Sequence, residues 1–287
     1  MGILKALFGG KDNTTPEEKK QEERTRKFDI LKYDGVRAMQ TGHSEYAMMC
    51  FNHALEIKED METRDYLSQA MIHTGNLEGA YGQLEILAGA FPDNTALLAR
   101  MAHVAFMLED YNDMTGICEK ALQHDAANTA ILNLYARALI AMGNNNEAIE
   151  KLNKAIELDE RQGEALLMRG ELLLKAGNYE GAAADIDTLM NLAPDNEDVI
   201  MLKARYEKAL KHYDEAINLY NKVTDINPFC AEAYAERGET KLLNGDEEGG
   251  NKDIADAEEM GISDATGNEN IEQKTKDSYK SMNPLGI

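Results

Sequence analysis

The sequence contains no tryptophan, and it has only five prolines and three cysteines among its 287 residues. The cysteines, Cys50, Cys118 and Cys230, lie far apart in the sequence and form no CxxC pair. Each stands where the pattern described below places packed side chains or a turn between helices. We therefore interpret the three cysteines as small buried thiols of a protein in a reducing compartment.

Long apolar runs are also missing. None approaches the roughly 20 residues that an α-helix needs to span a bilayer. At the N-terminus, Ile3, Leu4, Leu7 and Phe8 form an apolar group that is too short for the core of a signal peptide, and no cleavage signature follows it. Ala6 stands where an N-myristoylation signal has Ser or Thr. We expect a cytoplasmic protein.

Basic residues are scarce, with 30 Lys and Arg against 52 Asp and Glu, and the formal net charge is −22. Such a surface repels phosphate backbones and anionic membranes. Nucleic acid is therefore not expected as a partner, and contact with a membrane is not favoured.

Motifs of catalysis and of cofactor binding are absent from the sequence. Residues 9–11 (Gly-Gly-Lys) lack the first glycine and the hydroxyl residue of a phosphate-binding loop, and no GxGxxG follows a strand pattern. The six histidines are scattered, without an HxxxH or HExxH arrangement, so no metal site is predicted. We predict a protein without enzymatic activity and without a cofactor.

What the sequence does contain is a period of 34 residues, which is clearest when each unit is counted from a start such as Gly163. Only the first interval is one residue short. The eighth residue of every unit is small: Gly35, Ser68, Ala102, Ala136, Gly170, Ala204 and Gly238. The twentieth is small in all units but one: Ala47, Ala80, Met114, Ala148, Ala182, Ala216 and Gly250. A fixed period of this length indicates a repeat architecture.

This pattern resembles the tetratricopeptide repeat family over residues 28–261. The resemblance rests on the period, on the small residues, on Pro92, Pro194 and Pro228 at unit ends, and on a glycine between the two helices of five units: Gly42, Gly75, Gly143, Gly177 and Gly245. The early tryptophan of the family is replaced, mostly by leucine, at Leu31, Arg64, Leu98, Leu132, Leu166, Ile200 and Tyr234. Met114 in the third unit suggests looser contact between the helices there.

The resemblance implies an all-α fold: a right-handed superhelical solenoid of about seven antiparallel helix–turn–helix units with a C-terminal capping helix. A small residue lets two helices approach to within the roughly 8–10 Å of close packing. Each hairpin is too small to bury its own apolar face and stacks on its neighbours. We expect units at residues 28–60, 61–94, 95–128, 129–162, 163–196, 197–230 and 231–261.

The two ends of the chain lie outside these units. Residues 1–27 are expected to form a flexible charged segment, in which residues 1–11 are either a weak membrane or partner anchor or a frayed terminus. Residues 12–27 form a linker or a short helix that would begin near Thr15 and Pro16. Residues 262–287 are expected to hold the capping helix and a tail that Pro284 interrupts, and this tail could dock in the groove.

A ligand of such a solenoid would bind the concave wall lined by the first helices, according to the known architecture of the family. Arg100, Arg137 and Arg205 occupy wall-facing places and could bind acidic or C-terminal groups of a peptide. In the competing interpretation, which we favour, they neutralise Glu164, Glu171 or Asp198 within the protein. Arg169 and Arg237 could likewise pair with acids on the next hairpin. The remaining candidates along the wall are His103, Phe106, Met107, Asn133, Ile140, Met168, Leu174 and Met201.

The carboxylate clamp that tetratricopeptide repeats use for chaperone C-termini is missing. Lys32 stands at the first clamp position, but Val36 and Tyr66 replace the asparagines that should follow. We therefore expect a non-catalytic adaptor that binds a peptide or helix of another protein in its groove. The alternative is a structural or membrane-peripheral assembly subunit that acts through its N-terminal amphipathic segment.

The proposed contact between helices can be tested at the twentieth residue of the fifth unit. We expect Ala182→Leu to lower the free energy of unfolding by about 1–3 kcal/mol, because the larger side chain overpacks the interface between the two helices. Urea unfolding followed by circular dichroism measures the change. An unchanged midpoint would contradict the assignment of this residue to a helix contact.

Overall fold

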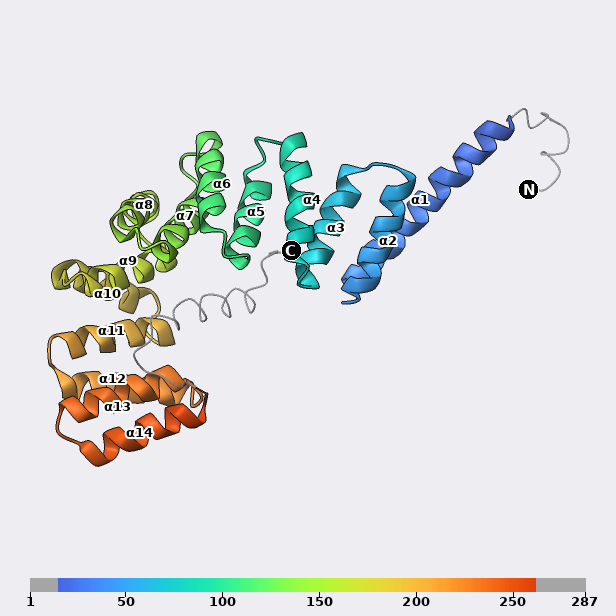
Figure 1. The fold of residues 1–287 in the computed structure, drawn as a ribbon. Helices are drawn as coiled ribbons and strands as arrows, with labels where there is room; N and C mark the ends of the chain where they lie inside the picture. Colours follow the sequence, from blue (N-terminus) through green and yellow to red (C-terminus); the bar gives the residue numbers. More distant parts are fainter. Residues whose placement is uncertain (1–14, 262–287) are drawn as a thin grey trace, which may run out of the picture. The chain divides into compact units, whose positions relative to one another are not determined.

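The structure, a computed structural model, describes residues 15–261 (Figure 1). Within that range it contains fourteen α-helices and no strand, which confirms the all-α prediction. The expected N-terminal anchor at residues 1–11 and the expected capping helix at residues 262–287 lie outside the described residues.

The helices are α1 (Pro16–Gln40), α2 (Ser44–Ile57), α3 (Met61–His73), α4 (Leu77–Ala90), α5 (Thr95–Met107), α6 (Tyr111–His124), α7 (Thr129–Ala141), α8 (Asn145–Leu158), α9 (Gly163–Lys175), α10 (Tyr179–Leu192), α11 (Glu197–Ala209), α12 (Tyr213–Ile226), α13 (Ala231–Leu243) and α14 (Glu247–Glu259).

The chain divides into two compact units, Met1–Asp110 and Tyr111–Ile287. The first unit and the second unit below are these two parts, and the 34-residue units of the sequence are called repeats. The described part of the first unit holds α1 to α5, and that of the second holds α6 to α14. Within each unit, consecutive helices pack against one another. The boundary falls between α5 and α6, inside the expected third repeat, where Met114 stands in place of a small residue.

Turns between the helices follow the glycine pattern of the sequence. Five glycines lie directly after first helices and adopt a positive φ between 75° and 90°, a conformation that costs glycine little: Gly42, Gly75, Gly143, Gly177 and Gly245. In the third and sixth expected repeats the same place is taken by Glu109 (φ 61°) and Lys211 (φ 64°). The left-handed turn is therefore kept even where no glycine is available for it.

Close approach of the helices depends on the small residues. Ala47, Ala80, Ala148, Ala182 and Ala216 are completely buried. The tightest pair is Gly238 on α13 with Gly250 on α14. A Cβ atom added at Gly238 would lie 2.8 Å from the carbonyl oxygen of Gly250, and one added at Gly250 would lie 2.9 Å from that of Gly238. The two backbones are in direct contact at this point.

The N-terminal helix differs from the expectation. Thr15 caps α1: its Oγ1 accepts from the amide of Glu18 at 3.2 Å, and the Glu18 carboxylate accepts from the amide of Thr15 at 2.6 Å. The start near Thr15 is therefore as predicted. However, residues 16–27, which the division assigned to a flexible segment, are helical and continue into the first repeat. The result is one helix of 25 residues instead of a short one.

The contact between Gly238 and Gly250 predicts opposite effects for two glycine-to-alanine changes. Gly238→Ala should lower the free energy of unfolding by about 1–3 kcal/mol, because a backbone carbonyl blocks the added methyl group. Gly116→Ala on α6, where nothing lies within 4 Å of the added Cβ, should raise it by about 0.5–1 kcal/mol through helix propensity. Chemical denaturation of both variants measures the difference, and a stabilised Gly238→Ala protein would contradict the packing described here.

Candidate functional site

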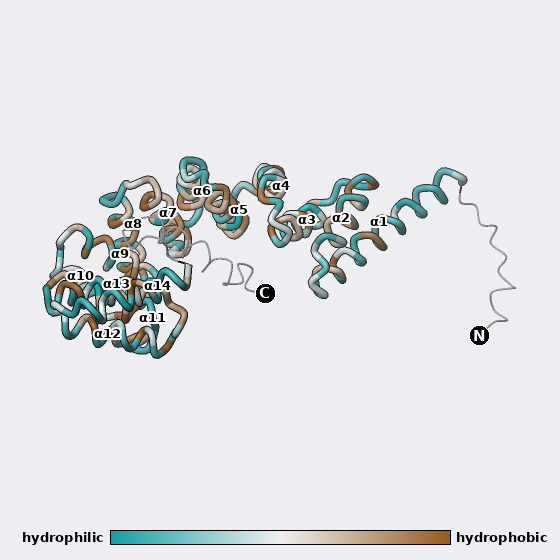
Figure 2. Tube along the Cα trace, turned by 60° about the horizontal axis from the view of Figure 1, so that its bottom comes forward, coloured by the Kyte–Doolittle hydropathy of each residue, from teal (hydrophilic) through white to brown (hydrophobic). Residues whose placement is uncertain are grey.

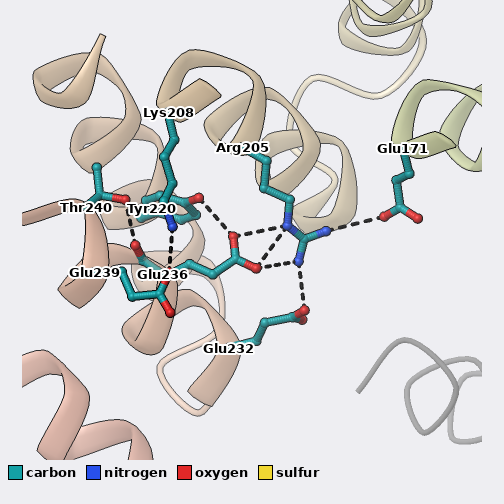
Figure 3. A network of polar contacts seen from close by, with 8 residues as sticks. All are labelled: Glu171, Arg205, Lys208, Tyr220, Glu232, Glu236, Glu239 and Thr240. Atoms are coloured by element: carbon teal, nitrogen blue, oxygen red, sulfur yellow. Dashed lines mark hydrogen bonds and ion pairs between the residues drawn. The ribbon is translucent and has the colours of Figure 1, made fainter. Parts of the chain in front are cut away.

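The most extensive polar network of the second unit centres on Arg205 of α11 (Figure 3). Its Nε donates to both carboxylate oxygens of Glu236 at 3.0 Å, and its Nη2 donates to Glu236 Oε1 at 2.8 Å. Nη2 also donates to Glu232 Oε1 at 2.7 Å, and Nη1 donates to Glu171 Oε1 at 3.3 Å. Glu171 lies on α9, and the other two acids lie on α13. Three successive first helices therefore converge on one guanidinium group.

Neighbouring side chains hold Glu236 in place. The buried hydroxyl group of Tyr220, on α12, donates to Glu236 Oε2 at 2.8 Å. Lys208, one turn after Arg205, donates to Glu239 Oε2 at 2.7 Å and forms a third ion pair between α11 and α13 (Figure 3). Three ion pairs thus fix the register of α11 against α13, while Tyr220 ties α12 to the same carboxylate.

The network holds more negative than positive charge. One guanidinium group faces three carboxylates, each with at most about a quarter of its side chain exposed. Burial lowers the pKa of Arg205, but the ion pairs with Glu236, Glu232 and Glu171 outweigh burial and keep this pKa above its ordinary value. Burial raises the pKa of Glu171, and Arg205 only partly offsets that effect. The charged form of Glu171 thus depends on Arg205.

The other two candidate arginines also form ion pairs with a neighbouring repeat. In the second unit, Arg137 Nη2 on α7 donates to Glu164 Oε1 at the start of α9. The buried Asn133 Nδ2 donates to Glu164 Oε2 at 3.1 Å, so Glu164 joins these two candidates. In the first unit, Arg100 Nη1 on α5 donates to Asp65 Oδ1 on α3 at 2.5 Å. The intramolecular pairs predicted with Glu164 and Glu171 are confirmed, whereas the pair with Asp65 was not foreseen.

Arg169 and Arg237 show a recurring contact that sequence reasoning identified only in part. Arg169 on α9 forms a two-point ion pair with Asp185 on α10, at 3.0 and 2.5 Å, and donates to Asn153 on α8 at 2.7 Å. Arg237, 68 residues later (237 minus 169), repeats this arrangement with Asp253 at 2.6 and 2.8 Å and with Asn221 at 2.9 Å.

The acid of this contact lies on the second helix of the arginine's own hairpin, and not on the next hairpin as expected. The amide comes from the second helix of the preceding hairpin. The available signal was the recurrence of Asn, Arg and Asp at matching places two repeats apart.

The apolar candidates divide into core and surface residues. Phe106 and Met201 are buried, and Met201 belongs to a core cluster with Ala204, Leu219 and Tyr220. Neither side chain is presented to a ligand in this structure, because neighbouring helices cover it. Leu174 is partly exposed and packs against the cluster around Leu166 and Ile186. His103 and Met107 in the first unit, and Ile140 and Met168 in the second, are partly exposed.

Among residues 15–261, no helix is long and apolar enough to cross a membrane. The same part of the chain contains no group of three or more His, Cys, Asp and Glu side chains that could hold a metal ion. Its three cysteines are buried, and burial raises the pKa of Cys118 to about 12.

Comparison with known proteins agrees with this architecture. A tetratricopeptide repeat family model matches residues 142–206 and 173–236. A tetratricopeptide repeat protein from Parabacteroides merdae has a TM-score of 0.71 to this chain at 18% sequence identity, and the alignment covers 87% of this chain and 97% of that one. Residues 142–236 thus match the tetratricopeptide repeat family, and the described residues have the fold of a tetratricopeptide repeat protein.

Two curated relatives share parts of the chain. "DnaJ homolog subfamily C member 3" of Gallus gallus is 24% identical over 191 residues, which is 64% of this chain and 33% of that protein. "Protein SGT1 homolog" of Oryza sativa subsp. japonica is 28% identical over 120 residues, which is 42% of this chain and 31% of that protein. The chain thus spans about a third of the length of these relatives.

The excess of acids around Arg205 predicts a pH-dependent defect. Arg205→Met should lower the free energy of unfolding by about 2–4 kcal/mol at pH 7, because three carboxylates then lack their shared cation and are only partly screened by water. Loss of the arginine raises the pKa of Glu171 further above its unfolded value. The destabilisation is therefore largest above this raised pKa and decreases as the pH falls through it. Urea unfolding between pH 7 and pH 5 measures the trend.

A second variant tests the cause of that defect. Adding Glu236→Gln to Arg205→Met removes one of the repelling charges and should recover part of the lost stability at pH 7. A defect of equal size at both pH values, without recovery in the double variant, would show that Arg205 acts through packing alone.

Proposed function

We propose that this protein is a non-catalytic scaffold that binds a peptide or a helix of a partner protein along its first helices. The observation that carries the proposal is the convergence of α9, α11 and α13 on Arg205, because it makes these helices a continuous, internally braced wall (Figure 3). A role in protein interaction is supported by the repeat family and by the curated relatives. We also propose that residues 28–261 form the seven repeats expected from the sequence.

The apolar contacts of the partner would be made beside the ion pairs. Ile140 on α7 and Met168 and Leu174 on α9 are partly exposed and lie on first helices of the second unit. Methionine adapts to differently shaped partners because its side chain is unbranched. The wall thus combines a fixed polar framework with adaptable apolar side chains.

The charge of the partner follows from the paired arginines. An acidic group of the partner would have to displace Glu236 or Glu232 from Arg205, and the network already holds three carboxylates for one cation. Arg100 and Arg137 each have an acid from a neighbouring repeat. An acidic partner is therefore disfavoured at Arg205. Within this proposal the apolar side chains supply most of the affinity and of the discrimination between partners, and the charges influence mainly the rate of association.

The compartment is also part of the proposal. Three cysteines that are buried far apart in the sequence support a reducing environment such as the cytoplasm. The alternative of a membrane-peripheral or structural subunit depends on residues 1–11, which lie outside the described part of the chain.

The wall can be tested with peptides selected on the full chain from a displayed random-sequence library. We expect Met168→Lys to raise the dissociation constant of the selected peptides at least about tenfold, because it replaces an apolar contact with a charge; tenfold corresponds to about 1.4 kcal/mol. Isothermal titration calorimetry measures the constants.

The matched control is Met142→Lys, at the exposed methionine that follows α7. It should bind the peptides as the unchanged protein does, and thermal unfolding should show both variants folded. Equal binding by Met168→Lys and the unchanged protein would exclude α9 as the peptide site.

A further inference from the structure

The outer side of the first hairpin exposes apolar side chains that no other described residue covers. The terminal repeats of a solenoid normally carry a polar outer face, because no further repeat covers it. Here Ile30 on α1 is 50% exposed, and Tyr46 and Met49 on α2 are each 54% exposed. α14, the last described helix, instead exposes Lys252, Glu258 and Glu259. The apolar exposure on α1 and α2 therefore needs an explanation.

Five residues of α1 form a row along this side: Glu23, Lys27, Ile30, Asp34 and Arg37. Their spacings alternate between four and three residues, which is the spacing of a helix face that contacts another helix. Glu23, Lys27 and Arg37 are exposed, and Asp34 is half-buried beside Tyr46, with which it interacts electrostatically. We call these five residues, together with Tyr46 and Met49, the N-terminal face.

The first three turns of α1 extend beyond the buried part of the helix, and within them Arg24 Nη2 donates to the backbone carbonyl of Ile57 at 3.5 Å. Every residue from Thr15 to Lys27 is exposed, and Phe28 is the first buried one. Figure 2 shows this half of the helix as hydrophilic. Residues 16–27 extend α1 by about 18 Å beyond its first buried residue. A helix that is polar all round gains little from burial and is stabilised mainly when another element binds beside it.

The order of charges in the row indicates what binds there. Around Ile30, the row reads acid, base, apolar, acid, base. If a second α1 lies antiparallel with Ile30 opposite Ile30, Glu23 faces Arg37 of the second copy and Lys27 lies beside Asp34 of the second copy. Two-fold symmetry makes each of these opposite-charge pairs twice. In a parallel pairing, each charged residue would instead lie beside the same residue of the second copy and repel it. The order of charges therefore favours the antiparallel pairing.

We propose that the N-terminal face binds the same face of a second copy of this chain, with the two α1 helices antiparallel and Ile30 at the two-fold axis. Residues 16–27 of one copy then lie along residues 33–44 of the other, next to the start of α2. They cover Tyr46 and Met49 of that copy and are themselves covered by it. A helix of 25 residues is about 37 Å long, which suffices for the whole row. No residue of the polar network around Arg205 takes part in this pairing.

The test is the association of the full-length protein, measured by sedimentation velocity over a range of concentrations. The unchanged protein should form dimers. Lys27→Glu places two acids side by side at two symmetry-related points and should weaken the dimer at least about tenfold. Adding Asp34→Lys to Lys27→Glu restores opposite charges between the copies and should restore the dimer. Residues 27 and 34 are two helical turns apart in one chain, so this recovery reports contact between copies.

The control is Asp29→Lys, a charge reversal at an exposed residue of α1 outside the row, which should leave the dimer unchanged. Removal of residues 1–14 should also leave it unchanged. A protein that stays monomeric at all concentrations, a double variant without recovery, or a dimer that disappears with residues 1–14 would each overturn the proposal. The last result would assign the association to those residues, and a monomer would leave the N-terminal face to another occupant.

Discussion

Stacking of one hairpin on the next is the constraint on which this structure depends, because no pair of helices encloses its own apolar side chains. One core cluster joins Leu166 of α9 with Ile186 and Leu189 of α10 and with Val199 and Leu202 of α11. A second joins residues of α11, α12 and α13 in the same way. Each core therefore belongs to two hairpins. Stability in such an arrangement is close to a sum of local contacts, and an end hairpin always leaves one face without a partner.

Ion pairs follow the same nearest-neighbour rule but make a different contribution. A buried or half-buried ion pair adds little net stability, since desolvation of the charges offsets their attraction. An unmatched charge, however, is costly. Arg169, Arg205 and Arg237 each meet their acids only when the adjoining helices have the observed register. The apolar residues thus hold the hairpins together, while Arg205 joins three successive hairpins and Arg169 and Arg237 each join the two helices of one hairpin.

The sequence predicts the parts of this fold that depend on local geometry. Turn glycines and the small eighth and twentieth residues favour the close approach of two helices, and they recur in most repeats, so their period was sufficient to define the hairpins. Glu109 and Lys211 show that the turn persists without glycine, because packing on both sides determines its conformation.

Side-chain direction within the first helices was harder to predict. Consecutive positions on a helix point about 100° apart, and small rotations decide whether a side chain such as Met201 enters the core or faces solvent. The length of α1 was missed for another reason. A run of mixed charges is compatible with a linker or a helix, and the cap formed by Thr15 and Glu18 together with a continuous backbone decides between them.

The charge distribution also limits how a partner would recognise the first helices. Near Arg205 the local field is set by one cation and three carboxylates, and the chain as a whole carries a net charge of −22. Salt screens that net charge beyond the Debye length of about 8 Å, so the charge acts only on a partner that is already near the surface. There the net negative charge would mainly raise the rate at which a basic partner associates. In contact, the paired arginine offers no free charge to an incoming acid. Discrimination between partners would then rest on the shape of the apolar contacts around Met168 and Leu174, since the ion pairs hold the backbone beneath them in a fixed position.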